Sequence, residues 1–372
     1  MKKIAFISDS IYPYNKGGKE KRLLDVSMLL SKRGWNVHIY TMKWWKGEDV
    51  RQENGVTLHA ISKLYPLYAG DRRSIKEGVL FGLACFKLIG ENWDVIDVDH
   101  MPFFPLFSTK IVCILKHKKM VATWHEVWGA SYWKKYMGNM GIISYFIEKM
   151  SIYMPNTVIS VSNHTTKMLK NILKMKASIV TATNGINIDE IKKIKPSKTK
   201  SDVIYAGRLL THKNIEILVR AISILRDKNP KIKALIIGDG PERKNIAKLI
   251  KSKKLTKNIK LIKFIESHAE LYSLMKSSRV FALPSTREGF SLVAAESFAA
   301  NIPVVTTNHP QNAASDLIQE NKNGITINLN EKEMARAIEK LMKTKKRDYT
   351  KYAEKYSWNN IIPKIERVYN SL

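Results

Sequence analysis

The amino-acid sequence predicts an α/β protein with two doubly wound, Rossmann-like parallel sheets, and three observations indicate this fold class. Short apolar runs alternate with longer segments of helical spacing along nearly the whole chain. These runs are continuously apolar, as parallel strands are when helices cover both faces of their sheet. The length of 372 residues also exceeds the ~250–300 at which a single hydrophobic core stops growing, so two domains are expected.

The expected strands form two series that are separated by a polar segment. The first series is KIAFISD, VHIYTM, VIDVD, MVATWH and TVISVS, and the second is DVIYAGRL, KALIIGD, IKLIKFI, VFALPS, IPVVTT and GITINL. The segment between them is lysine-rich and contains one proline, which is typical of a linker. We therefore expect an N-terminal domain at 1–185, a linker at 186–200, a C-terminal domain at 201–350, and a terminal helix at 351–372 that packs back on the N-terminal domain.

Cysteine usage and hydropathy predict a cytoplasmic protein. Cys85 and Cys113 are the two cysteines, and each lies in an apolar segment, so neither a disulfide framework nor a CxxC metal pair is expected. The start MKKIAFISDS contains an apolar run of four residues, which is too short for a signal peptide and suits a first strand. No apolar stretch approaches the ~18 residues that a membrane span requires.

The formal net charge of +30 is spread over both halves of the chain. Residues 1–185 hold 27 Lys+Arg and 14 Asp+Glu, and the remainder holds 36 and 19. Two interpretations stay open: a lysine bias of the whole proteome, or attraction to an anionic partner such as a polyphosphate ligand or an acidic membrane surface. The second interpretation predicts a peripheral position at the inner face of the membrane.

Cations and glycines follow two strands of the second series. Ligands of such sheets bind at the carboxyl ends of strands, and two sheets that face each other form a cleft. Gly207 and Arg208 directly follow one strand, and Lys213 comes five residues later. A guanidinium fork and an ammonium point charge suit a diphosphate, although two solvated cations would show the same pattern. The glycines of IIGDGPER after the next strand indicate a tight turn.

The segment PSTREGFSLVAAESFAA, residues 284–300, begins with a proline turn and continues as a helix. Glu296 in this helix could accept hydrogen bonds from a ribose diol, and Glu288 ahead of it could reach a hexose. An acidic residue at a helix start is also common without a ligand, because it complements the helix dipole. The free amides at the helix start form an anion site for a phosphate, and they belong to Gly289, Phe290, Ser291 and Leu292. Together these groups predict a nucleotide-sugar site.

The order of these motifs resembles that of the retaining glycosyltransferases of family 4, which have the GT-B fold. GRL…KN, GDGP, the E-x7-E pair in PSTREGFSLVAAE, and PVV occur in the second half, and YPYNKGG, VATWHE, VISVSNHT and TNGI in the first. The resemblance covers residues 1–345. Two positions depart from it: Asn301 stands where many members have glycine, and Asp97-x-Asp99 followed by His100 stands where many have His-x-His.

The resemblance adds candidate residues in the first half. It implies that the loop with Gly17 and Gly18 closes on the donor and that His125, after the strand MVATWH, lies beside the donor sugar and positions sugar and acceptor. Without the family, a flexible loop and a structural histidine would explain these residues; Glu126 is a weaker candidate. Asp97 and Asp99 continue an apolar strand, so no DxD metal site is expected, and neither metal nor cofactor is required besides the nucleotide-sugar co-substrate.

Aromatic residues and lysines mix in two segments, WWK at 44–46 and residues 131–154. The second segment is similar to an interfacial amphipathic stretch, with aromatic side chains at headgroup depth and lysines toward phosphate. A pair of core-packed helices with a sugar-binding lip would give the same pattern, so both interpretations stay open. If the segment is interfacial, the acceptor is lipid-linked.

We expect a hexosyltransferase that moves a sugar from a UDP- or GDP-linked hexose to a glycan or lipid-linked acceptor in cell-envelope or glycoconjugate synthesis, with retention implied by the resemblance.

A GT-B nucleotide-sugar epimerase is one alternative, and it would consume the donor without an acceptor. A nucleic-acid-binding protein is a remote alternative that only the charge suggests. It would gather basic and aromatic residues on one element, whereas the charge here is dispersed, so no nucleic-acid partner is expected. The sequence does not place the residues that select the base and the sugar, and the region around Phe264 and Ile265 is a candidate for them.

Overall fold

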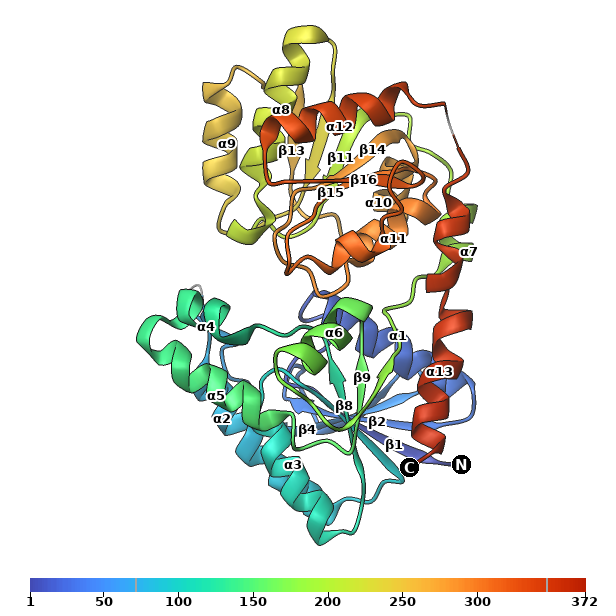
Figure 1. Cartoon of the computed structure of the whole chain (residues 1–372). Helices are drawn as coiled ribbons and strands as arrows, with labels where there is room; N and C mark the ends of the chain where they lie inside the picture. The colour runs from blue at the N-terminus through green and yellow to red at the C-terminus, as the bar shows by residue number, and fades with distance from the viewer. Residues whose placement is uncertain (71, 346) are drawn as a thin grey trace. The chain divides into compact units, whose positions relative to one another are not determined.

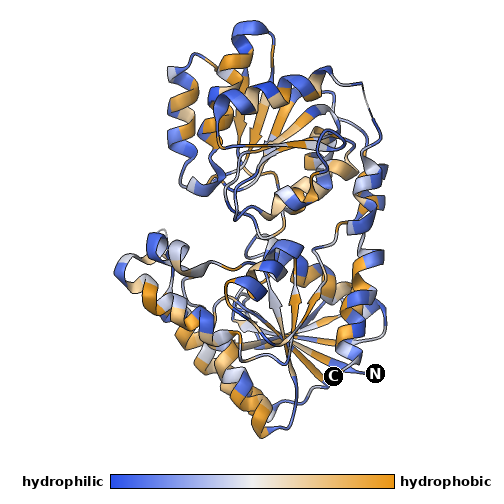
Figure 2. Cartoon of the chain, viewed as in Figure 1, coloured by the Kyte–Doolittle hydropathy of each residue, from blue (hydrophilic) through white to orange (hydrophobic). Residues whose placement is uncertain are grey.

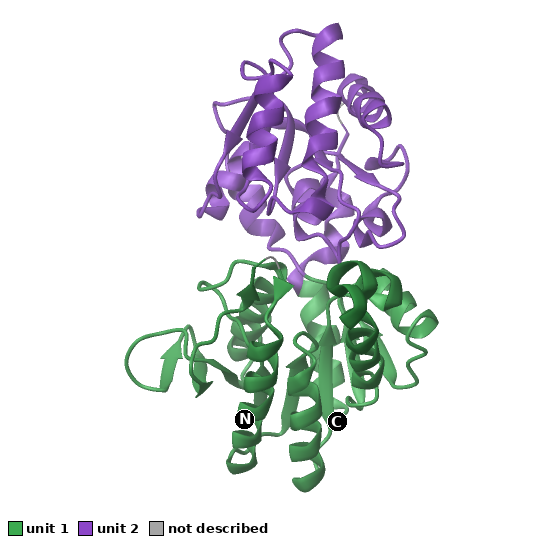
Figure 3. Cartoon of the chain, turned by 90° about the vertical axis from the view of Figure 1, so that its left-hand side faces the viewer, with its two compact units in different colours: residues 1–184, 359–372 green, residues 185–358 purple. Residues whose placement is uncertain are grey.

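A computed structural model describes residues 1–70, 72–345 and 347–372. The chain forms two compact units (Figures 1 and 3): unit 1 is Met1–Asn184 with Asn359–Leu372, and unit 2 is Gly185–Trp358. The segment at 186–200, expected as a linker, holds helix α7 (Ile188–Lys193) and belongs to unit 2. Residues 351–358 also belong to unit 2, so the terminal helix expected at 351–372 begins later, as α13 (Trp358–Asn370).

Unit 1 is built on an eight-stranded sheet in the order β10-β9-β8-β7-β1-β2-β4-β3. All neighbours pair in parallel except β3 and β4. The strands are β1 (Lys3–Ile7), β2 (Asn36–Met42), β3 (Val50–Glu53), β4 (Val56–Ser62), β7 (Val95–Asp99), β8 (Met120–Trp124), β9 (Thr157–Ser160) and β10 (Ser178–Thr181), and a separate small pair joins β5 (Tyr68–Ala69) to β6 (Arg72–Arg73).

Helices cover both faces of this sheet, as the continuously apolar strands predict. One face carries α2, α3 and α5, and the other carries α1 and α13 (Figure 1). The helices of unit 1 are α1 (Gly18–Lys32), α2 (Ile75–Ala84), α3 (Phe104–Leu115), α4 (Gly129–Met137), α5 (Gly141–Ser151) and α6 (Asn163–Asn171), with 3-10 turns η1 (Cys85–Gly90) and η2 (Gly138–Met140). Together they bury the strands from water on both sides.

Unit 2 repeats the architecture with six parallel strands in the order β13-β12-β11-β14-β15-β16. The strands are β11 (Ser201–Ala206), β12 (Ala234–Ile237), β13 (Ile259–Ile262), β14 (Ser278–Leu283), β15 (Val304–Thr307) and β16 (Gly324–Ile327). The helices besides α7 are α8 (Ile215–Lys228), α9 (Arg243–Ser252), α10 (His268–Lys276), α11 (Leu292–Ala299) and α12 (Glu331–Lys343), with 3-10 turns η3 (Thr211–Lys213), η4 (Ala313–Leu317), η5 (Thr350–Tyr352) and η6 (Glu354–Tyr356).

The order of strands places a switch point in each sheet. In unit 1 the chain winds from β1 toward β4 and then from β7 toward β10, so the direction reverses between β1 and β7. In unit 2 the reversal falls between β11 and β14. Ligands of doubly wound sheets bind beside the carboxyl ends of strands at such points. The fold therefore marks two places for functional residues, one in each unit.

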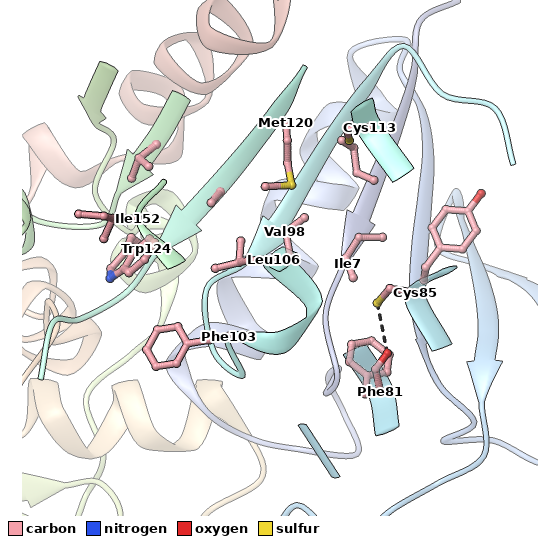
Figure 4. Packing of buried hydrophobic residues seen from close by; sticks show 14 of the residues in the cluster. Ile7, Phe81, Cys85, Val98, Phe103, Leu106, Cys113, Met120, Trp124 and Ile152 are labelled. Atoms are coloured by element: carbon pink, nitrogen blue, oxygen red, sulfur yellow. Dashed lines mark hydrogen bonds between the residues drawn. The ribbon is translucent and has the colours of Figure 1, made fainter. Parts of the chain in front are cut away.

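The core of unit 1 lies between the sheet and the helices α2, α3 and α5. Trp124 is fully buried, and Phe81, Leu106 and Met120 pack in the same cluster (Figure 4). Cys85 donates its thiol hydrogen to the Phe81 carbonyl oxygen at 3.3 Å. Burial raises the pKa of the Cys113 thiol to about 11, so this thiol is inert.

The two segments with mixed aromatics and lysines fold in different ways. Trp45 is buried and Trp44 donates its indole N–H to the Asp9 carbonyl oxygen at 2.9 Å, so both tryptophans at 44–46 are packed. Residues 131–154 form the helix pair α4 and α5, which buries Trp133 but exposes Ile142 and Phe146. Within the described residues, we find no helix whose length and hydropathy would carry it across a bilayer.

Candidate functional site

The switch point of unit 2 gathers the cations that follow β11. Lys213, in η3, donates to Glu288 Oε1 at 2.7 Å, and both side chains are largely buried. His212 directly precedes Lys213 in the chain. Its burial together with the charges of Arg287, Lys213 and Arg208 lowers its pKa to about 2. His212 is therefore neutral at physiological pH and adds no charge to this group of cations. The cluster presents positive charge at the place where the fold puts a ligand.

Hydrogen bonds between the loop after β11 and the loop after β14 hold this cluster in place. The Asn214 side-chain amide donates to the Pro284 carbonyl oxygen at 3.0 Å, and the Thr286 amide donates to the His212 carbonyl oxygen at 2.9 Å. Glu288 is fixed on its other side, because its amide donates to the Gln311 carbonyl oxygen at 3.1 Å. The carboxylate of Glu288 therefore keeps its position beside Lys213.

Two glycines allow the neighbouring turn to approach this loop. A Cβ on Gly238 would lie 1.9 Å from the Gly207 carbonyl oxygen, and a Cβ on Gly240 would lie 2.4 Å from the Leu209 carbonyl oxygen. No side chain fits at such distances. The turn after β12 is thus a tight turn, and its glycines let the backbone pack beside Arg208.

Helix α11 begins at the same switch point with a residue in an unusual conformation. Ser291 caps the helix at φ +82°, a region that costs a non-glycine residue ~1–3 kcal/mol and is found at functional sites. Its hydroxyl is buried and, in the described residues, has no hydrogen-bond partner. Among the described residues, the amides of Gly289, Phe290, Ser291 and Leu292 donate to no backbone carbonyl outside the helix. Such amides can bind an anion, and the sequence predicts a phosphate at this place.

Glu296, the second glutamate of the E-x7-E pair, lies inside α11 and is buried. The Tyr272 hydroxyl donates to Glu296 Oε1 at 2.8 Å and so fixes the orientation of the carboxylate. Phe290 is buried as well and packs edge-to-face on Tyr356, with ring centroids 5.3 Å apart. The predicted phosphate and sugar ligands of unit 2, from Arg208 to Glu296, thus lie on the two loops and the one helix that meet between β11 and β14. Phe264 and Ile265 lie elsewhere, after β13 at the edge of the sheet.

In unit 1, His125 follows β8 and contacts the end of β7. Its Nε2 lies 3.0 Å from Asp99 Oδ1, and Lys19 Nζ lies 3.7 Å from Asp99 Oδ2. Burial raises the pKa of Asp99, but Lys19 and His125 outweigh burial and lower it to about 2. Asp99 is therefore an anion that orients His125. From the sequence, Asp99 is a candidate only for metal binding, and it marks a departure from the His-x-His motif.

Lys19 links this pair to a second buried carboxylate, Asp9, which lies two residues after the end of β1. Lys19 and Arg73 both contact Asp9 and lower its pKa against the opposing effect of burial. Glu77 lies beside them, and its burial and the charge of Asp9 raise its pKa to about 8. Sequence reasoning missed Asp9, Lys19 and Arg73. Two signals were available: a charged residue close to a strand end (Asp9) and another directly after the glycine pair (Lys19).

Gly17 and Gly18 lie where α1 begins, one residue before Lys19. Gly17 is the cap of the helix, and a Cβ at this position would lie 2.4 Å from Glu20 Oε2. The N-terminal half of this helix also borders a small cavity of about 20 Å³, which can hold one water molecule. Polar side chains line part of it: Lys19, Arg22, Asp97, Asp99, Thr123 and His125.

Asp97 lies on the same strand as Asp99, but its carboxylate is held by hydrogen bonds from neighbouring hydroxyl groups. Tyr369 of α13 donates its hydroxyl to Asp97 Oδ2 at 2.6 Å, and Thr123 donates to the same oxygen at 2.8 Å. Burial nevertheless raises the pKa of Asp97 to about 6. Among the described residues, no group of three His, Cys, Asp or Glu side chains could hold a metal ion.

Asp97→Asn is expected to remove a pH dependence of stability. The native carboxyl binds its proton more tightly than the unfolded one, with a pKa of about 6 against an ordinary 3.8, so wild-type stability falls as pH rises from 3.8 to 6. Relative to wild type, the variant should therefore gain up to ~1.4 kcal/mol per pH unit across this window, or ~3 kcal/mol in total. Urea unfolding of both proteins at pH 4, 5, 6 and 7 measures this difference, and a constant difference would contradict the assignment.

The motifs at the strand ends and the fold of each unit define a glycosyltransferase with the GT-B fold. Two family models match the sequence: residues 16–190 match Glycosyltransferase Family 4, and residues 187–357 match Glycosyl transferases group 1. The chain belongs to this family of glycosyltransferases, which confirms the resemblance stated from the sequence.

Individual proteins support the family and the fold. The chain is 28% identical over 181 residues to the O-antigen biosynthesis glycosyltransferase WclY of Escherichia coli, an alignment that covers 46% of this chain and 48% of WclY. The chain thus spans about half the length, or less, of the first curated relatives that it matches.

Two solved structures have the same fold over the full chain. Sucrose-phosphate synthase from Thermosynechococcus elongatus superposes with a TM-score of 0.80 at 18% identity, covering 100% of this chain and 99% of that one. HepE of Anabaena in complex with UDP-glucose superposes with a TM-score of 0.74 at 17% identity, covering 100% of both chains.

Proposed function

We propose that the protein transfers a hexose from a UDP- or GDP-linked sugar, with retention at the anomeric carbon, to a glycan or lipid-linked acceptor of the cell envelope. The observation that carries this proposal is the cation cluster around neutral His212 beside the start of α11, at the switch point of unit 2. The similarity to WclY, which is named for O-antigen biosynthesis, supports the kind of acceptor.

Different residues of unit 2 bind different parts of the donor. Arg208, Lys213 and the amides of residues 289–292 bind the diphosphate, whose negative charge grows as the bond to the sugar breaks. This stabilisation of the leaving group lowers the barrier, because fixed donors and cations act where charge develops. Glu296 accepts hydrogen bonds from the ribose hydroxyls, and Glu288, held beside Lys213, accepts from the hexose hydroxyls.

The unit 1 residues act on the transferred sugar and the acceptor. His125, oriented by Asp99 at 3.0 Å, positions the sugar and the acceptor hydroxyl. Gly17 and Gly18 keep the start of α1 open for close approach of the donor. The acceptor oxygen forms the new bond to the anomeric carbon as the bond from this carbon to the β-phosphate oxygen breaks. The nucleoside diphosphate leaves, and the acceptor proton passes to it or to water.

Donor binding by the E-x7-E segment can be tested with a panel of UDP-, GDP-, ADP- and TDP-sugars. Binding to the folded state raises stability by RT ln(1 + [L]/Kd), ~2.7 kcal/mol at a hundredfold excess over Kd. We expect one nucleotide to raise the melting temperature of wild type but not of Glu296→Ala. The matched control is Glu270→Ala, an exposed glutamate of α10 in the same unit.

The outcomes separate the proposal from its alternatives. A melting-temperature rise that Glu270→Ala retains and Glu296→Ala loses supports the donor site. No rise with any nucleotide sugar contradicts it. Donor consumption without an acceptor indicates an epimerase, and the anomeric configuration of the product, measured by NMR, tests retention.

A further inference from the structure

The outer surface of α2, η1, α3 and α5 exposes large apolar side chains along one side of unit 1. The most prominent are Leu83 (58% exposed), Ile89 (53%), Ile114 (60%), Leu115 (60%), Ile142 (75%) and Phe146 (60%). We call this surface, defined by these six residues, the docking face. Figure 2 shows apolar residues along these helices on the side away from the sheet.

The docking face exposes more large apolar side chains than the whole described part of unit 2. In unit 2, the exposed large apolar side chains are those of Phe264 and Leu329. A contiguous apolar patch on a folded domain marks an interaction surface, whereas single exposed residues are ordinary. Since the inner sides of the same helices already fill the core of unit 1, the outer sides are left for a second body to contact.

The exposed charges on these elements and on α4 all have one sign. Residues 75–90, 104–119 and 129–154 contain nine lysines, none of them buried. The two acidic residues in these ranges, Glu77 and Glu148, are 1% and 0% exposed. Glu148 accepts hydrogen bonds inside the unit, from the amides of Trp128 at 2.8 Å and Gly129 at 2.9 Å. The docking face thus carries apolar side chains and cations without an exposed carboxylate.

We propose that the docking face binds the surface of a membrane leaflet that contains anionic lipids. The apolar side chains enter the boundary between headgroups and acyl chains, while the lysines reach the lipid phosphates. A second copy of the chain does not fit this surface, because each copy would bring the same lysines into the interface and like charges would oppose each other. The proposal does not depend on the transfer reaction, and its test uses no donor.

The test is co-flotation of the full chain with vesicles of phosphatidylcholine alone and of phosphatidylcholine with 30% phosphatidylglycerol. We expect binding to the anionic vesicles, weaker binding to the neutral ones, and a loss of binding at high salt, which screens the charges. Ile142→Ser with Phe146→Ser should weaken binding at least tenfold. The matched control is Leu64→Ser with Leu329→Ser, two exposed leucines outside the docking face, and it should bind as wild type does.

A charge variant completes the test. Each basic residue near an anionic leaflet contributes about a fivefold factor in partitioning, so Lys134→Gln, Lys135→Gln and Lys149→Gln together should lower binding more than tenfold. Lys244→Gln, Lys248→Gln and Lys251→Gln, on exposed positions of α9 in unit 2, serve as the control. Three results would overturn the proposal: no flotation with anionic vesicles, equal loss in both lysine variants, or a dimer in solution that Ile142→Ser with Phe146→Ser dissociates while flotation is unchanged.

Discussion

Lys213→Met is expected to lower kcat/KM for the nucleotide sugar by about 10²- to 10³-fold. Lys213 lies 2.7 Å from Glu288 and both side chains are largely buried, so the variant loses a cation of the diphosphate site and leaves a carboxylate unpaired. Removing one partner of a buried charge pair costs ~2–5 kcal/mol, and ~3–4 kcal/mol corresponds to this change in rate. Steady-state kinetics measure the effect, with Lys244→Met on exposed α9 as the control.

Calorimetry with shorter ligands identifies which part of the donor Lys213 contacts. If the ammonium group binds the diphosphate, Lys213→Met should weaken binding of a nucleoside diphosphate far more than binding of the corresponding nucleoside. Equal weakening of both would mean that the substitution disturbs the whole pocket. Unchanged affinity for the diphosphate would remove Lys213 from the site. Melting temperatures of the variants without ligand show whether each protein is folded.

Asp99→Asn is expected to lower kcat by about 10²-fold and to leave the donor KM within about threefold of wild type. Asp99 is anionic and lies 3.0 Å from His125 Nε2, so it fixes the orientation of the imidazole ring. An amide in its place keeps the shape but not the charge, and in hydrolases the same exchange beside a catalytic histidine costs as much as ~10⁴-fold in kcat. The smaller effect expected here follows from a role in positioning.

The neighbouring strand residue provides the matched control. Asp97 precedes Asp99 by two positions and is also buried, but its carboxylate accepts from Tyr369 and Thr123. Asp97→Asn should therefore keep kcat near wild type, and Asp99→Glu should recover part of the lost rate. Equal losses of kcat in Asp97→Asn and Asp99→Asn would show a general structural defect. A rise in donor KM without a loss of kcat would place Asp99 in binding.

The grouping of the candidate residues in unit 2 could be predicted, because each of them closely follows a strand of one parallel sheet. Arg208 and Lys213 follow one strand, and Glu288 and Glu296 follow another, so the parallel order of the sheet brings them together. The unit 1 cluster was harder to predict. Arg73 reaches Asp9 across 64 positions, and nothing in the residues around either position indicates the contact.

The fold was predictable where strands are continuously apolar and less so elsewhere. The strand β4 alternates buried and half-buried residues, and its partner β3 is mostly polar, so neither was expected. The signal was the turn between them, Asn54–Gly55, which has φ of 52° and 77° and favours a hairpin. The segment at 186–200 was expected as a linker because of its lysines, but Asn187 caps α7 there by accepting from the Glu190 amide at 3.2 Å.

The return of the last helix to the first unit has a consequence for protein synthesis. Tyr369 of α13 bonds to Asp97 on a central strand, and Glu366 accepts from Trp35 at 3.0 Å, so unit 1 is complete only with residues 359–372. The ribosome makes all of unit 2 before these residues. Domains usually fold in the order of their synthesis, but here the second unit can finish folding first. The nascent first unit must wait, with the α1 side of its sheet partly uncovered, until the final helix emerges.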